Sequence, residues 1–155
     1  YPNLNDDKWL WGGTLDDIYA TLRHGVRDAT DSETRFSQMP AFGADGMLTR
    51  PQIGDVTDYV LKLSGQAHDD AAATRGESLF ADNCAACHGD KGQGDRAQGA
   101  PSLTDGIWLF GGDRASITAQ VWKPAHGVMP AWGSRLDDAT VKQLAVFVHS
   151  LGGGE

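Results

Sequence analysis

The sequence contains the same four short motifs twice, in the same order. The pairs are YPNLNDDKWLWGG at 1–13 with APSLTDGIWLFGG at 100–112, HGV at 24–26 with HGV at 126–128, MPAFG at 39–43 with MPAWG at 129–133, and YVLKLSG at 59–65 with FVHSLGG at 147–153. Such an ordered set indicates the tandem duplication of one small domain. The first copy also carries an additional segment, RDATDSETRFSQ at 27–38, between its second and third motifs.

Helices are expected after Thr14, Thr49, Asp113 and Asp137 and over 74–84, where apolar residues recur every three or four positions behind capping residues. No segment alternates convincingly between apolar and polar residues. The sequence therefore predicts an all-α fold with two tandem small domains. Their expected boundaries are 1–65 for the first domain, 66–74 for a small polar linker and 75–155 for the second domain.

The chain has a net charge of -8, from 13 basic and 21 acidic residues. This charge argues against nucleic acid and against anionic membrane surfaces as partners, and it suits a partner with a basic face. No apolar run approaches the roughly 18–20 residues that cross a bilayer. Because the sequence begins with Tyr1 and not with methionine, we expect a piece of a longer protein, with any membrane anchor outside this segment.

The only two cysteines of the chain lie in CAACH, as Cys84 and Cys87, directly before His88. The pattern C-x-x-C-H predicts covalent attachment of a c-type haem, in which two thiols bond to the porphyrin and the histidine binds the iron. A zinc site would need further ligands, and a thioredoxin-like redox pair would need a βαβ setting. A disulfide between positions so close would close a small, strained loop.

A low-spin haem needs a ligand on the opposite face of the iron. Met129, in VMPAWG, is the expected distal ligand of the haem bound at His88, and a His/Met pair raises the potential of such a haem. Met39 occupies the same position in the first copy and is expected to bind the iron of a first haem. His24 and His126 also occupy equivalent positions and remain the alternative ligands.

Several other residues are expected near the haems. Pro101 lies thirteen residues after His88, where small c-type cytochromes often have a proline whose carbonyl accepts a hydrogen bond from the proximal imidazole. Pro2 is its counterpart in the first copy, and Trp9 and Trp108 are expected to pack on haem or in the core. The attachment motif that corresponds to CAACH would fall before Tyr1. We therefore expect a first domain truncated at its N-terminus, whose haem is attached by upstream residues.

The segments YPNLNDDKWLWGGTLDDIYATLRHG, LFADNCAACHG and GAPSLTDGIWLFGG, together with the two methionine motifs, resemble the dihaem cytochrome c subunit (subunit III) of cbb3-type cytochrome oxidases. The resemblance covers essentially the whole chain and implies two cytochrome c-like domains at the periplasmic face of the bacterial inner membrane, held by an N-terminal membrane helix. It also implies electron transfer from a donor, a cytochrome c or the bc1 complex, to a mono-haem subunit and a haem–copper subunit that reduces oxygen to water.

Under this resemblance the chain is an electron-transfer subunit of an oxidoreductase complex and not an enzyme in isolation. The alternatives are a free dihaem shuttle, or the cytochrome subunit of a periplasmic dehydrogenase. A dihaem peroxidase is disfavoured, because it needs an open iron position and both copies retain a methionine motif.

Overall fold

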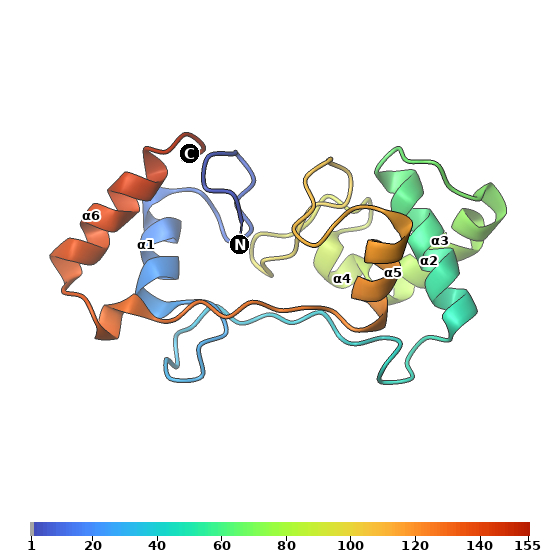
Figure 1. Cartoon of the computed structure of the whole chain (residues 1–155), viewed down its shortest axis with the longest axis horizontal. Helices are drawn as coiled ribbons and strands as arrows, with labels where there is room; N and C mark the ends of the chain where they lie inside the picture. The colour runs from blue at the N-terminus through green and yellow to red at the C-terminus, as the bar shows by residue number, and fades with distance from the viewer. Residues whose placement is uncertain (1) are drawn as a thin grey trace. The chain divides into compact units, whose positions relative to one another are not determined.

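The structure is a computed structural model that describes residues 2–155. Its helices are α1 Leu15–His24, α2 Arg50–Leu63, α3 Asp70–Asn83, α4 Ala85–His88, α5 Arg114–Trp122, the 3-10 helix η1 Trp132–Ser134 and α6 Asp138–His149 (Figure 1). Among these described residues, β-pairing is limited to three isolated bridges. The prediction of an all-α chain is therefore confirmed. None of the helices found in residues 2–155 is long and apolar enough to cross a membrane.

The helices begin at the expected capping residues, with one exception. Thr14 accepts a hydrogen bond from the backbone N–H of Asp17 at 3.1 Å, and Asp137 accepts one from that of Thr140 at 2.9 Å. Helix α3 begins at Asp70, inside the predicted linker 66–74, and not at Thr74. The side chain of Asp69 accepts from the N–H of Ala72 at 2.8 Å, which caps this additional first turn.

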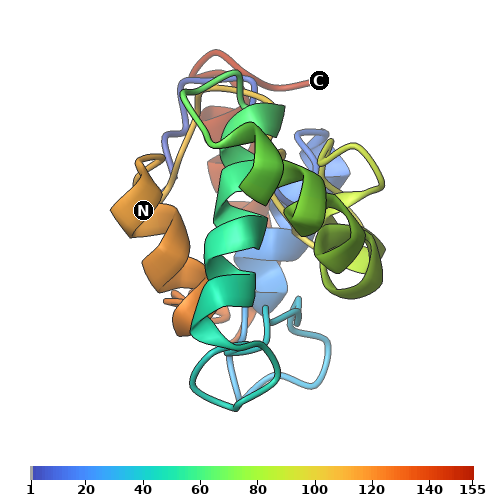
Figure 2. The same cartoon turned by 90° about the vertical axis from the view of Figure 1, so that its right-hand side faces the viewer.

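The helices form two compact units, and each unit combines parts of both sequence copies. Unit 1 comprises the described residues up to Ser37, Arg96–Gly99 and His126–Glu155, whereas unit 2 comprises Gln38–Asp95 and Ala100–Ala125. In unit 1, α1 packs against α6 and η1. In unit 2, α2 packs against both α3 and α5, and α4 follows α3 (Figure 2). This grouping differs from the expected division into 1–65 and 75–155, because the later helix of each copy packs with the earlier part of the other copy.

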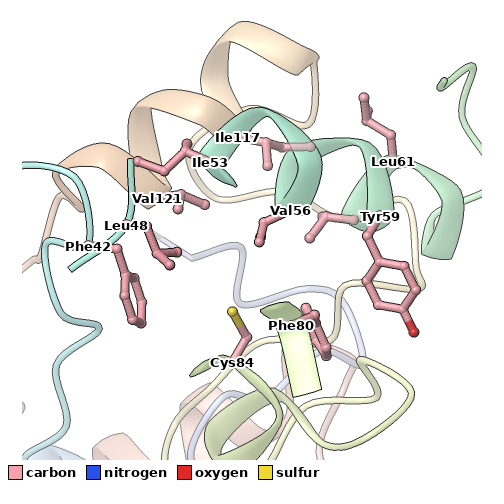
Figure 3. Packing of buried hydrophobic residues seen from close by; sticks show 11 residues of the cluster. Phe42, Leu48, Ile53, Val56, Tyr59, Leu61, Phe80, Cys84, Ile117 and Val121 are labelled. Atoms are coloured by element: carbon pink, nitrogen blue, oxygen red, sulfur yellow. The ribbon is translucent and has the colours of Figure 1, made fainter. Parts of the chain in front are cut away.

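The core of unit 2 lies between α2, α3 and α5. Its buried side chains are Phe42, Leu48, Ile53, Val56, Tyr59, Val60, Leu61, Phe80, Cys84, Ile117 and Val121 (Figure 3). Helices α2 and α3 approach closely at Gly76, where an added Cβ would lie 2.0 Å from the carbonyl oxygen of Asp55. The rings of Tyr59 and Phe80 pack next to this contact, with centroids 5.2 Å apart.

A buried carboxylate on α2 joins this helix to α3 and α5 in unit 2. Asp58 on α2 is 4% exposed and accepts hydrogen bonds from both terminal nitrogens of Arg114 on α5, one of them at 2.7 Å. It also accepts from the backbone N–H of Asp69, the cap of α3, at 2.8 Å. The Arg114 guanidinium holds the pKa of Asp58 below its usual value, which outweighs the opposite effect of burial.

The helix pairs of the two units carry different side chains at equivalent positions. The repeat places Leu15 where α5 has Arg114, and Val146 where α2 has Asp58. Unit 2 joins Arg114 to Asp58, and in unit 1 Leu15 and Val146 line one shallow hollow. If each copy folded by itself, Leu15 would face the Asp58 carboxylate and Arg114 would face Val146.

A second pair of equivalent positions also carries different side chains in the two units. Arg23 on α1 forms an ion pair with Asp138 on α6, with 3.1 Å between nitrogen and oxygen. At the equivalent positions, unit 2 places the guanidinium of Arg50 over the ring of Trp122, 4.4 Å from its centroid. If each copy folded by itself, Arg23 would lie next to Arg50. Repulsion between these two positive charges would oppose that arrangement.

The two tryptophan motifs have the same backbone conformation at their paired glycines. Gly12 and Gly111 both have φ of 92°, a conformation that favours glycine. An added Cβ at the following glycine of each copy would lie 2.4 Å from the indole of Trp9 or of Trp108. The paired glycines are thus explained by a turn with positive φ and by close contact with the indole ring.

Candidate haem site

The two cysteines lie where α3 ends and α4 begins. Cys84 is the C-cap of α3 and is buried, with its sulfur pointing into the core of unit 2, while Cys87 is half-buried (Figure 3). Both thiols are free. Burial, with a smaller contribution from Cys87, raises the pKa of Cys84 to about 11, so this side chain is a neutral thiol at pH 7. The site therefore presents two unpaired thiols three residues apart on one helical turn.

His88 is oriented by a backbone carbonyl. Its Nδ1 lies 3.0 Å from the carbonyl oxygen of Pro101, which can only accept, so Nδ1 carries the proton and Nε2 keeps its lone pair. The hydrogen bond expected between these two residues is present. Burial lowers the pKa of His88, against the opposing effect of the Pro101 hydrogen bond, and favours the neutral imidazole that binds a metal.

The loop after His88 folds back on itself to bring Pro101 into place. The N–H of Gly94 donates to the carbonyl of His88 at 2.7 Å, and the N–H of Leu103 donates to that of Gly92 at 2.7 Å. Gly94 has φ of 82°, and a Cβ there would lie 2.7 Å from the backbone nitrogen of Ser102. These glycines permit the close approach of two backbone segments that positions the proline carbonyl.

Met39, and not Met129, shares a compact unit with His88. Met39 is half-buried and packs against the apolar cluster that contains Cys84. Met129 is also half-buried but belongs to unit 1. The expected pairing of Met129 with His88 assumed that each sequence copy folds by itself, whereas these two residues lie in different units, so the pairing stays a prediction.

The backbone around Met129 is held by Val26 and by the start of the additional segment 27–38, which only the first copy contains. Val26 and Met129 exchange two backbone hydrogen bonds of 3.0 Å each. Arg27 Nε donates to the carbonyl of Gly127 at 2.7 Å, and the Asp28 carboxylate accepts from the N–H of Ala131 at 2.7 Å. Sequence reasoning missed Arg27 and Asp28, although the charged insertion next to a motif with a candidate ligand was a usable signal.

The remaining expected residues divide between the units. Trp108 is half-buried against the cluster of unit 2. Trp9 lies in unit 1, where its Nε1 donates to the carbonyl of Gly153 at 2.5 Å, and Pro2 is exposed.

Both alternative histidine ligands belong to unit 1, whereas His88 belongs to unit 2. The Nδ1 of His24 lies 3.1 Å from the nearer oxygen of Asp31, so that ring nitrogen already has a carboxylate partner. His126 begins the last segment of unit 1. Neither histidine shares a unit with the cysteines.

Comparisons with known proteins indicate the family of this chain. The family described as "Cytochrome C oxidase, cbb3-type, subunit III" matches residues 71–148. The chain belongs to this family. It is 57% identical over 155 residues to the cbb3-type cytochrome c oxidase subunit CcoP of Cereibacter sphaeroides, covering 100% of the chain and 53% of that relative.

Further relatives of cbb3-type oxidases match over the whole chain. It is 54% identical over 155 residues to subunit FixP of Sinorhizobium medicae, covering 53% of it, and 52% identical over 162 residues to subunit CcoP of Azospirillum brasilense, covering 55% of it. The chain thus spans about half the length of the curated relatives it matches.

Membership of this cytochrome c family implies covalently bound haem c, and the residues of unit 2 fit that group. Two free thiols have the spacing of the two vinyl attachments, and the oriented imidazole keeps Nε2 available for iron. The thioether of Met39 is a soft, neutral donor in the same unit.

Proposed function

We propose that this chain carries electrons through c-type haems, as the periplasmic part of the dihaem subunit of a cbb3-type oxidase that reduces oxygen to water. Its proposed partners are a donor, cytochrome c or the bc1 complex, and the mono-haem and haem–copper subunits of the oxidase. The observation that carries the proposal is His88, whose Nδ1 is bound by Pro101 and whose Nε2 is left for iron beside two free thiols. The family match supports the same conclusion.

Within unit 2, we propose Met39 as the distal ligand of the haem attached at Cys84 and Cys87. Its packing against the Cys84 cluster supports this assignment, and so does the membership of Met39 and His88 in one compact unit. Met129 is then the distal ligand of a second haem in unit 1, attached through residues outside this sequence. The exchanged helix pairs support this arrangement, because the polar partners match only across the two copies.

The bound haem would supply one-electron exchange between ferrous and ferric iron. The residues of the chain set how readily this happens. The Pro101 carbonyl fixes the ring of His88 and increases its basicity, and the apolar cluster limits water at the site. A neutral thioether from Met39 favours the ferrous form relative to a second imidazole.

The test uses the chain of 155 residues, expressed in a bacterial periplasm with haem attached at its single CAACH motif. Met39→Ala should remove the near-infrared band of methionine-bound ferric haem and let the ferrous form bind carbon monoxide. Met129→Ala is the matched control and should keep the band. If Met129→Ala removes the band and Met39→Ala does not, the assignment of Met39 is refuted. Haem that is lost on acid–acetone extraction would refute covalent attachment.

A further inference from the structure

A single buried side-chain nitrogen among the described residues has no hydrogen-bond partner, and it is Nε of Arg35 in unit 1. The Nη2 of the same guanidinium donates to the backbone carbonyl of Asp17 at 3.2 Å and to its carboxylate at 3.3 Å. A buried donor without an acceptor destabilises the folded state, and such donors are rare in native proteins. The Nε of Arg35 therefore indicates an acceptor that the protein atoms do not supply.

Arg35 is held firmly in this position. Its N–H donates to the carbonyl of Gly25 at 3.2 Å, and its own carbonyl accepts from the N–H of Arg27 at 2.9 Å. The guanidinium lies over the ring of Trp11, 5.5 Å from the ring centroid. These contacts hold both the backbone and the guanidinium of Arg35 in place. The unpartnered position of Nε is therefore part of the folded structure of unit 1.

The surroundings indicate what the acceptor is. Arg35 is bonded to the backbone of Gly25, next to Val26, which pairs with Met129, the proposed distal ligand of the haem in unit 1. Trp11, under the guanidinium, belongs to the tryptophan motif of the same unit. The N–H groups of a planar guanidinium match a carboxylate or a phosphate better than other common acceptors. Haem carries two such carboxylates, its propionates.

We propose that Arg35 binds a propionate of the haem in unit 1. This inference rests on the proposed second haem. Arg35 lies in the segment 27–38, which has no counterpart in the second copy, so the haem of unit 2 has no equivalent arginine. A cation beside one haem favours its ferrous form, so Arg35 raises the potential of the unit 1 haem and makes the two haems unequal.

The experiment uses the full-length holoprotein, in which haem is first counted. Arg35→Gln removes the charge, Arg35→Lys keeps the charge but lacks the Nε–H, and Arg23→Gln removes another arginine charge from unit 1 as a matched control. Each variant is followed by redox titration of both haems and by the infrared redox-difference bands of the propionates. Arg35→Gln should lower one potential and leave the other unchanged, and both Arg35 variants should shift a propionate band. Arg23→Gln should shift no band.

Two results would overturn the inference in distinguishable ways. A wild-type protein with one haem per chain would refute the second haem and Arg35 together. Two haems with unchanged potentials and propionate bands in Arg35→Gln would refute the role of Arg35 alone. If Arg35→Gln does not accumulate as folded protein, Arg35→Lys decides, because an unshifted propionate band in that variant is equally contradictory.

Discussion

Replacing Asp58 by alanine tests whether its ion pair stabilises the packing of α2 with α5 and α3. The substitution removes three hydrogen bonds at once, two from Arg114 and one from the backbone N–H of Asp69. Asp58 is buried, so its former donors lose a partner at the centre of unit 2.

The size of the effect follows from the burial of each partner. Loss of one member of a buried ion pair costs about 3–5 kcal/mol. The side chain of Arg114 is 52% exposed and regains water, which reduces the cost, and Asp69, whose N–H also loses its acceptor, is an exposed residue. We therefore expect a loss of about 2–3 kcal/mol in the free energy of unfolding.

Chemical denaturation followed by circular dichroism measures this loss, and Asp55→Ala provides the matched control. Asp55 also lies on α2 and pairs with an arginine, but its side chain is 15% exposed, against 6% for Asp58, and its partner Arg75 is 61% exposed, so that change should cost no more than about 1 kcal/mol. The folded-state pKa of Asp58 is lowered, so its contribution is present above pH 4 and is lost as the pH falls below the unfolded value. Equal losses for Asp58→Ala and Asp55→Ala at pH 7 would refute the reasoning.

Two further changes probe the contacts that build each unit. Gly76→Ala would place a Cβ 2.0 Å from the Asp55 carbonyl oxygen and should force α2 and α3 apart; reduced thermal stability together with weaker near-ultraviolet circular dichroism would show this, and a wild-type melting curve would contradict it. Asp28→Ala should make exchange of the Ala131 amide hydrogen roughly tenfold faster, because that N–H loses its carboxylate partner. The hydrogen bond from the Ala131 N–H is the largest of the causes that lower the pKa of Asp28 to about 2. This contact should therefore persist in the wild type as the pH falls to about 3. Unchanged exchange of the Ala131 amide hydrogen in Asp28→Ala would argue against the contact.

Local features of the fold and the site were predictable from the sequence. The helix caps depend on residues close together in the chain, and so does the hydrogen bond between His88 and Pro101. Such short-range patterns fix local geometry with little dependence on the rest of the molecule.

The partner of each helix was not predicted, because the duplicated helices present similar apolar faces. Helices α2 and α6 both end in the same motif, so their apolar pattern fits either α1 or α5. The choice depends on a few side chains outside that pattern. Chiefly, α2 has Asp58 and Arg50 at the positions where α6 has Val146 and Asp138. Comparing the polar residues of the two copies position by position would have indicated the exchange.

The exchange of segments also affects the order in which the chain can fold. Apart from Arg96–Gly99, unit 2 is one continuous stretch that ends at Ala125, and the two main parts of unit 1 flank it. During synthesis from the N-terminus, unit 2 can thus fold before α6 has been made. Helix α1 cannot pack against α6 until that point. Once unit 2 has folded, most of the chain between α1 and α6 is compact. The conformational entropy lost when α6 packs against α1 is then smaller than for a flexible loop of the same length. We therefore expect unit 2 to fold before unit 1, although the first helix of unit 1 comes earlier in the sequence.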